Sequence, residues 1–350
     1  TTVQAQLADF GQVTVSGMHS SAGFASLDSK ISDVNLEAVT QFDVSTDLQL
    51  GKFFPEKAGI RIPMHFDYSE THITPEYNPH DPDIELQQDH DSYVEKDKQD
   101  SVKRLVVDYT QRKNINFMNI RKDRVGSKQP RVYDIENFNF TYAYSETYNR
   151  NVDIEYDLLQ DYRGGFGYNF AMAPKEVRPF ERIGFISRTN ALRIIKDFNF
   201  YYLPKSFSFN TEMIRTYGEM KLRDKSLGLI KIKPTFNKTW NWDRSYDLNF
   251  DLPRNLTLQF TAMASTYINV APGSGDSESE WYNEEARDTI NVRDQIFSFG
   301  NMERYQQNLT LNYNIPINKL PFLEWVTANA TYQSGYTWTA SPLSIQDRLG

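Results

Sequence analysis

The 350-residue sequence contains no cysteine, and this absence removes several classes of site at once. Disulfide bonds, zinc sites with thiolate ligands and cysteine nucleophiles are all excluded. The cellular compartment is left open, because many exported bacterial proteins also lack cysteine. Long hydrophobic runs are missing as well, since no apolar run approaches the ~18 residues that a transmembrane helix needs.

Excess positive charge and catalytic motifs are also missing. The formal net charge is -8 at pH 7 and no long basic stripe is present, which argues against a nucleic-acid partner. No G-x-S-x-G, P-loop or H-E-x-x-H motif occurs, and the five histidines stand at no ligand spacing. We therefore expect a protein that is not an enzyme and that binds no cofactor and no metal.

Alternation of apolar and polar residues is the dominant pattern that is present. Aromatic residues make up 14% of the chain, with 21 Tyr and 23 Phe, and many of them occupy every second position. Such alternation predicts strands with one apolar and one polar face. In the stretch 138–158, a short interruption at 148–151 predicts a hairpin. Its apolar side is Phe138, Phe140, Tyr142, Tyr144, Val152, Ile154, Tyr156 and Leu158, against Asn139, Thr141, Ala143, Ser145, Asp153, Glu155 and Asp157.

The same alternation recurs along most of the chain and predicts an all-β protein of antiparallel strands. No βαβ rhythm is visible, so a parallel sheet is not expected. Asn, Asp, Ser and Pro predict tight turns at 149–151, 203–206, 243–245 and 253–255. Two of these turns bracket the run 246–252, which we therefore expect to be a short strand. The other predicted strands fall at 34–38, 48–50, 60–68, 207–209, 256–261, 308–315 and 326–332.

Three longer connections interrupt the strands, at 77–101, 121–134 and 270–306. The first is acidic and the second is basic, whereas the third begins with Pro-Gly-Ser-Gly and becomes acidic. Within the third we expect a short helix, with Trp281 and either Ile290 or Ile296 contacting the body of the protein. We interpret residues 1–350 as a single portion of a longer protein.

A sheet with one apolar and one polar face has two common environments. In a soluble sandwich the apolar faces of two sheets meet, whereas in a membrane barrel the apolar face meets lipid and the polar face lines a wet lumen. The uniform Asn and Thr of the polar face and the aromatic residues at strand ends favour the barrel. Alternation of apolar and polar residues, taken by itself, is more frequent in soluble sandwiches. The residues alone therefore leave both interpretations open.

Three short motifs have both a structural and a functional interpretation. The cluster 80–85 (HDPDIE) has carboxylates suited to calcium but lacks the glycine of an EF-hand loop, so a solvated acidic loop is the prediction. The run 163–167 (RGGFG) predicts a bend or bulge rather than a phosphate loop. The basic stretch Arg121, Lys122, Arg124, Lys128 and Arg131 is either a solvated loop or a contact with anionic lipid head groups or an acidic partner.

Several longer strings, taken together and in order, resemble the SprA/Sov family of Bacteroidota. The resemblance extends over nearly the whole chain, and the strings are long and unusual in composition. They include LADFGQVTVSGMHSSAGFASL (7–27), LQLGKFFPEKAGIRIPMHFDYSE (48–70), PEYNPHDPDIEL (75–86), NFNFTYAYSE (137–146) and WNWDRSYDLNFDLPRNLTLQFTA (240–262).

The resemblance implies a fold and a function that alternation does not. Members of this family are very large transmembrane β-barrels of the cell outer membrane. They form the translocon of the type 9 secretion system and are needed for gliding motility in gliding members. The pore passes folded cargo proteins with a C-terminal secretion signal, a PorV-type shuttle barrel engages a lateral opening, and a plug protein seals the empty channel. Family members are several times longer, so this chain would be an internal portion of one barrel.

On this interpretation the two sides of the strands have separate roles. The connections 77–101 and 270–306 would be extracellular or cap elements. The alternatives are a soluble surface β-sandwich that binds glycans or proteins, and another large barrel such as a nutrient receptor or lipopolysaccharide transporter. Candidate lumen-facing residues are Asn139, Thr141, Asp153, Glu155, Asp247, Asn249, Asp251, Thr257, Asn308 and Thr310. Candidate lipid-facing residues are Phe138, Phe140, Tyr142, Ile154, Tyr156, Leu248, Phe250, Leu258, Leu311 and Tyr313.

Overall fold

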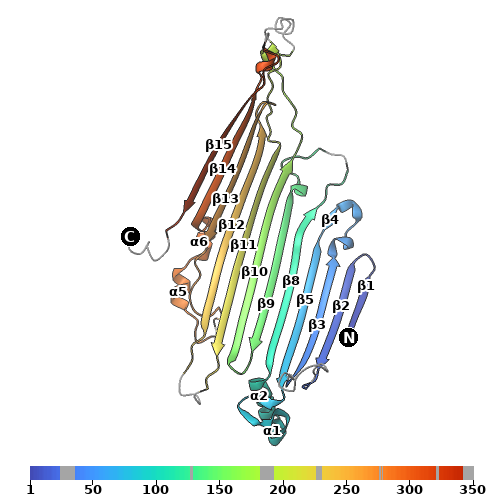
Figure 1. Cartoon of the computed structure of the whole chain (residues 1–350), viewed down its shortest axis with the longest axis vertical. Coiled ribbons are helices and arrows are strands. Elements are labelled where there is room, and N and C mark those ends of the chain that lie inside the picture. The colour runs from blue at the N-terminus through green and yellow to red at the C-terminus, as the bar shows by residue number, and fades with distance from the viewer. Residues whose placement is uncertain are drawn as a thin grey trace.

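One large antiparallel sheet dominates the protein (Figure 1). The computed structural model describes residues 1–23, 36–126, 129–181, 193–225, 231–275, 277, 279–320 and 323–341. Within these residues, a 13-stranded sheet holds almost all the strands, which confirms the all-β, antiparallel prediction. The expected strand start at Val34 and the basic residue Lys128 lie outside the described residues.

The strands follow chain order across the sheet, because each long strand pairs with the long strands next to it in sequence. The short strand β4 (Ile60–Arg61) pairs with β8 outside this path. The path is β1 (Thr2–Leu7), β2 (Gly11–Ser20), β3 (Glu37–Gln49), β5 (Pro63–Pro75), β8 (Asp108–Lys122), β9 (Phe138–Arg150), β10 (Ile154–Ala171), β11 (Ser206–Leu222), β12 (Thr235–Asp251), β13 (Leu256–Tyr267), β14 (Asn301–Ile315) and β15 (Ala328–Thr339).

The long connections contain short helices and a small second sheet. Between β5 and β8 lie the two-stranded sheet of β6 (Tyr77–Asn78) and β7 (Asp81–Glu85), then α1 (Leu86–Ser92) and α2 (Lys96–Val106). The segment 77–101 is therefore a folded element rather than a plain loop. The helix expected between β13 and β14 is present as two helices, α5 (Glu284–Thr289) and α6 (Val292–Phe297). The remaining helices are α4 (Arg193–Lys196), η2 (Leu50–Phe53), η3 (Glu56–Ala58), η4 (Ile135–Asn137) and η6 (Ile317–Lys319).

Strand direction fixes the end of the sheet from which each connection leaves. Successive strands alternate in direction, so the connections 77–101 and 270–306 leave from the same end, where α1 and α2 lie in Figure 1. The basic connection 121–134 leaves from the opposite end. The sequence could not show this arrangement, because it depends on the number of strands between the connections.

Strand β12 corrects one prediction. The turn expected at 243–245 is absent, and β12 runs unbroken for 17 residues. Asp243 pairs with Glu212 and Ser265, and Ser245 pairs with Asn210 and Met263. The polar composition that suggested a turn instead belongs to the polar side of a central strand, where two neighbouring strands supply the backbone hydrogen bonds.

The sheet is a single layer with few fully buried side chains. Among the described residues, no second sheet covers its apolar side, so these residues form no two-sheet sandwich. One small buried cluster lies under α2, where Leu86, Val106 and Val107 are buried. Another lies on β12 and β13, where Thr266 is 2% exposed and donates a hydrogen bond to the Trp242 carbonyl. No helix within the described residues is long and apolar enough to span a membrane.

The unbroken path of β12 can be tested with proline. Replacing Ser245→Pro removes a ladder hydrogen bond from a central strand, and we expect a loss of about 3 kcal/mol or more and failed assembly. Glu56→Pro is the matched control, because Glu56 is the first residue of η3 and the preceding Pro55 is already extended, with φ -55 and ψ 139. The yield of protease-resistant protein in membranes is the measurement. Equal yields from the two variants would contradict an unbroken β12 and would support the turn predicted at 243–245.

Candidate functional site

The backbone register sorts the strand residues into two faces. Residues paired directly across antiparallel strands point to the same side, and successive residues point to opposite sides. The aromatic face is the side that carries the paired row Phe138, Tyr168, Phe209 and Tyr246. The polar face is the side that carries the next row, which is Asn139, Gly167, Asn210, Ser245 and Met263.

The predicted residues fall on these faces with three exceptions, which are Asp153, Ile154 and Glu155. Asp153 lies in the turn before β10, outside any strand. On the aromatic face are Phe138, Phe140, Tyr142, Tyr156, Leu248, Phe250, Leu258, Leu311 and Tyr313. On the polar face are Asn139, Thr141, Asp247, Asn249, Asp251, Thr257, Asn308 and Thr310.

A bulge at the start of β10 explains the other two exceptions. The register shifts between Ile154, which pairs with Leu222, and Tyr156, which pairs with Lys221. Leu222 and Lys221 are neighbours on a regular strand, so they point to opposite faces. The prediction that Ile154 shares a face with Tyr156 is therefore wrong. Glu155 contacts the Lys221 ammonium at 3.0 Å, so it also lies on the side opposite to the one predicted.

Half-exposed rings and aliphatic side chains form a continuous apolar patch on the aromatic face. Neighbouring strands contact through rings, with centroid distances of 5.2 Å for Phe140 and Phe166 and 5.0 Å for Phe209 and Tyr246. The outer side of the patch remains open, since Phe140 is 49% exposed. A patch that extends over this many strands is much larger than the surface of a soluble monomer usually exposes.

Glu70, Glu146 and Glu219 lie on the aromatic face toward the end that carries α1 and α2, and each accepts a hydrogen bond from a tyrosine hydroxyl. The Tyr109 hydroxyl donates to Glu70 at 3.0 Å, and the Tyr144 hydroxyl donates to Glu146 at 2.6 Å. The Glu146 carboxylate also accepts from the Lys113 ammonium at 2.9 Å. On β11, Glu219 accepts hydrogen bonds from the hydroxyls of Tyr156 and Tyr217. We call this set of carboxylates and their partners the tyrosine–carboxylate belt.

The connection between β13 and β14 folds over the aromatic face at this same end. The Phe299 ring lies 5.9 Å from the Trp242 ring, and the Arg244 guanidinium donates to the Phe299 carbonyl at 3.1 Å. The expected contacts are also present, because Trp281 lies under the Lys233 ammonium and Ile290 lines a cavity with Trp240. Sequence reasoning missed Phe299, since a lone Phe beside a glycine has no periodic signal.

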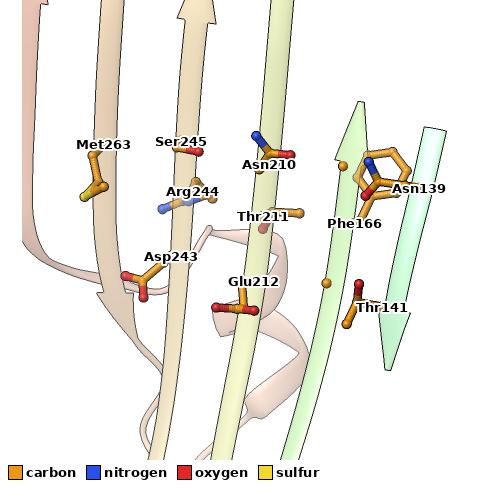
Figure 2. Close-up of a pocket in the computed structure, with 12 residues that line it drawn as sticks. Asn139, Thr141, Phe166, Asn210, Thr211, Glu212, Asp243, Arg244, Ser245 and Met263 are labelled. Carbon is orange, nitrogen blue, oxygen red and sulfur yellow. The ribbon is translucent and has the colours of Figure 1, made fainter. Parts of the chain in front are cut away.

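The polar face carries a shallow groove of about 290 Å³ across β9 to β13, which Figure 2 shows. Glycines create it, because a Cβ atom at Gly167 would meet the amide of Asn139 at 2.4 Å and that of Asn210 at 2.8 Å. The bend or bulge predicted for 163–167 is absent, since β10 pairs regularly on both sides there. In Figure 2, Asn139 and Asn210 flank the upper part of the groove, and Glu212 and Asp243 lie below them.

Three of the four described basic residues in the stretch 121–131 form ion pairs with nearby carboxylates. Lys122 contacts Glu136 at 2.7 Å, and Arg124 contacts Asp134 at 2.6 Å. Arg121 contacts Asp123 at 2.9 Å. The fourth, Arg131, donates to the Tyr133 hydroxyl at 2.8 Å. Internal partners for these side chains favour the interpretation as a structural loop. The cluster 80–85 is a strand rather than the predicted loop, because residues 81–85 form β7. Among the described residues, no group of three or more His, Asp or Glu is placed to hold a metal.

Acidification tests the ion pairs of this connection. The Arg131 backbone N–H and the Arg124 guanidinium lower the pKa of Asp134, and the Lys122 ammonium lowers the pKa of Glu136. A lowered pKa stabilises the fold above the ordinary carboxyl value of about 4, and this contribution is lost as the pH falls through the lowered value. We expect amide protection at 131–137, corrected for intrinsic exchange, to hold at pH 5 and to fall below about pH 4.

The variant Asp134→Asn gives the control for this titration. Its protection should already be reduced at pH 5 and should change less on acidification, because the titrating group is gone. Hydrogen exchange with mass spectrometry measures both proteins. An unchanged profile in the variant would show that the carboxylate does not hold the connection.

Comparison with known proteins gives a family match for the amino-terminal part of the sheet. Residues 1–89 match the family model SprA_N, described as motility related/secretion protein. This match spans β1 to β7, including the first strands of the aromatic face. No curated protein matches the chain. Residues 1–89 are thus similar to the SprA family of motility-related and secretion proteins.

Proposed function

We propose that this chain forms part of the wall of a very large outer-membrane β-barrel, the protein-conducting translocon of the type 9 secretion system. The observation that supports this is the continuous sheet of long strands, apolar on one face and polar on the other. Within the part of the chain that the structure describes, no second layer covers most of the apolar face. The match of residues 1–89 to a motility-related and secretion family supports the same function.

Strand length fits a membrane wall. A strand of 13 residues, such as β5, is ~44 Å long at ~3.4 Å per residue, and a tilt of ~45° reduces this to ~31 Å along the membrane normal. The hydrocarbon core of a bilayer is ~30 Å thick. Every strand of the path from β3 to β15 has at least the ~9–11 residues that a tilted crossing requires.

The open edges of the sheet fit a portion of a larger wall. Strands β1 and β15 each have one long partner among the described residues, which leaves one edge of each unpaired. In lipid an unpaired edge costs several kcal/mol per backbone group, so barrels close. The proposed wall therefore continues through further strands beyond β1 and β15.

The polar face suits a conduit for folded proteins. Asn139, Thr141, Asn210 and Thr257 present neutral hydrogen-bonding groups, which water solvates well. Exposed apolar patches would retain passing cargo, and this face has few of them. Cargo with a C-terminal secretion signal, a PorV-type shuttle barrel and a plug protein are the proposed partners, with lipid against the aromatic face. The energy for transport would be supplied by other components.

Lysine substitutions at neighbouring positions test which face meets lipid. Phe140→Lys and Leu248→Lys place a charge on the aromatic face, and we expect each to cost ~2–4 kcal/mol at mid-depth and to impair assembly. Asn139→Lys and Asn249→Lys are the matched controls, one residue away on the same strands and on the polar face. Membrane yield after a carbonate wash is the measurement. Normal assembly of all four variants would contradict a lipid-facing aromatic face.

Deletion of the full-length gene tests the transport function. We expect proteins with the C-terminal secretion signal to disappear from the culture supernatant and to accumulate in the periplasm, measured by quantitative proteomics. Complementation with the wild-type gene is the control. Normal secretion with a loss of nutrient uptake would instead indicate a receptor barrel, and release of the protein by a membrane wash would indicate a surface-binding protein.

A further inference from the structure

A cavity of about 440 Å³ lies between α2 and the ends of β9, β10 and β11 that meet it. Helix α2 contributes Ser101, Arg104 and Leu105 to its lining. The strand ends contribute Tyr148, Arg150, Glu155, Tyr156 and Arg223. Three arginines thus line one small cavity with a single carboxylate.

Two of the three guanidinium groups have unmet hydrogen-bonding capacity. The Nε atoms of Arg150 and Arg223 are buried and have no hydrogen-bond partner. Arg150 stacks 4.9 Å above the Tyr109 ring, and Arg223 donates to the carbonyl of Asn151 at 3.1 Å, so both groups are held in place. Arg104 is exposed and forms no ion pair within the described part of the chain. A buried donor without a partner costs about 1–3 kcal/mol.

The single carboxylate does not neutralise the arginines. Glu155 contacts the Lys221 ammonium at 3.0 Å, and the bulge in β10 orients it toward that residue. The cavity therefore keeps an excess of positive charge. Guanidinium groups bind tetrahedral oxyanions through pairs of N–H donors, which is why arginine is the usual residue for phosphate recognition.

We propose that Arg104, Arg150 and Arg223 form a binding site for a phosphate group, supplied by a lipid head group. The cavity opens at the end of the aromatic face that carries the tyrosine–carboxylate belt, beyond the apolar patch. Head groups would lie at that level if the apolar patch meets the hydrocarbon. The phosphate chemistry is independent of the proposed function, whereas the lipid as its source rests on it.

Phosphate binding is tested on the full-length protein purified in phosphate-free detergent. Isothermal titration with inorganic phosphate compares wild type with Arg104→Gln, which changes an exposed side chain and leaves the buried groups in place. We expect about tenfold weaker binding, the loss for one charge-assisted hydrogen bond. Arg104→Lys keeps the positive charge and should therefore recover part of the affinity. The recovery should be incomplete, because lysine lacks the paired N–H donors of arginine. Arg293→Gln, on exposed α6, should bind like wild type.

Lipid retention identifies the source of the phosphate. The same proteins, exchanged into nanodiscs of phosphatidic acid or phosphatidylcholine and returned to detergent, are examined by native mass spectrometry. We expect wild type to retain phosphatidic acid and Arg104→Gln to lose it. Weaker phosphate binding without selective lipid retention would overturn the lipid source. Equal phosphate binding by wild type and Arg104→Gln would overturn the site. Release of the protein from membranes by carbonate, with phosphate binding intact, would contradict only the proposed function.

Discussion

The hydrogen-bonded ladder between neighbouring strands is the constraint on which the other features depend. Side chains alternate with a period of two, so a slip of one residue would carry a ring from the aromatic face to the polar face. The register is regular through the middle of the sheet, and the shifts at Ile154/Tyr156, Ser265/Thr266 and Phe117/Ile120 lie near strand ends. At the shift in β8, Phe117 and Ile120 still pair with Tyr142 and Phe140 of the aromatic face, so the extra residue there does not exchange the two faces.

A sheet of one layer also explains why so few side chains are buried. Full burial of a large apolar side chain contributes about 1.5–3 kcal/mol, and the rings of the aromatic face obtain only part of this from their neighbours across the strands. Phe140 remains 49% exposed and Tyr332 remains 58% exposed. In the proposed barrel, contact with lipid would supply the missing part without the second sheet that a soluble sandwich needs.

The sequence predicted what depends on local alternation and missed what depends on neighbouring strands. The run from Phe138 to Ser145 predicts a strand and its two faces without ambiguity, because apolar and polar residues alternate in it without a break. Residues 243–245 are as polar as a turn, and only their pairing with β11 and β13 makes them a strand. The bulge at Ile154 is invisible for the same reason, since one extra residue leaves the composition unchanged. The closure of Phe299 onto Trp242 joins β12 to a distant connection, and no local pattern encodes that contact.

The charged side chains of the aromatic face are concentrated toward one end of the sheet. In the proposed barrel, charged side chains in the apolar patch would meet hydrocarbon, and the aromatic face there carries Phe, Leu and Ile. Toward α1 and α2 the same face carries Glu70, Glu146 and Glu219, each with tyrosine hydroxyls as donors. A carboxylate bound in this way keeps its charge beside a ring that tolerates both lipid and water. The face therefore changes from apolar to amphipathic to charged along the strands, the order in which a wall passes from hydrocarbon through head groups to water.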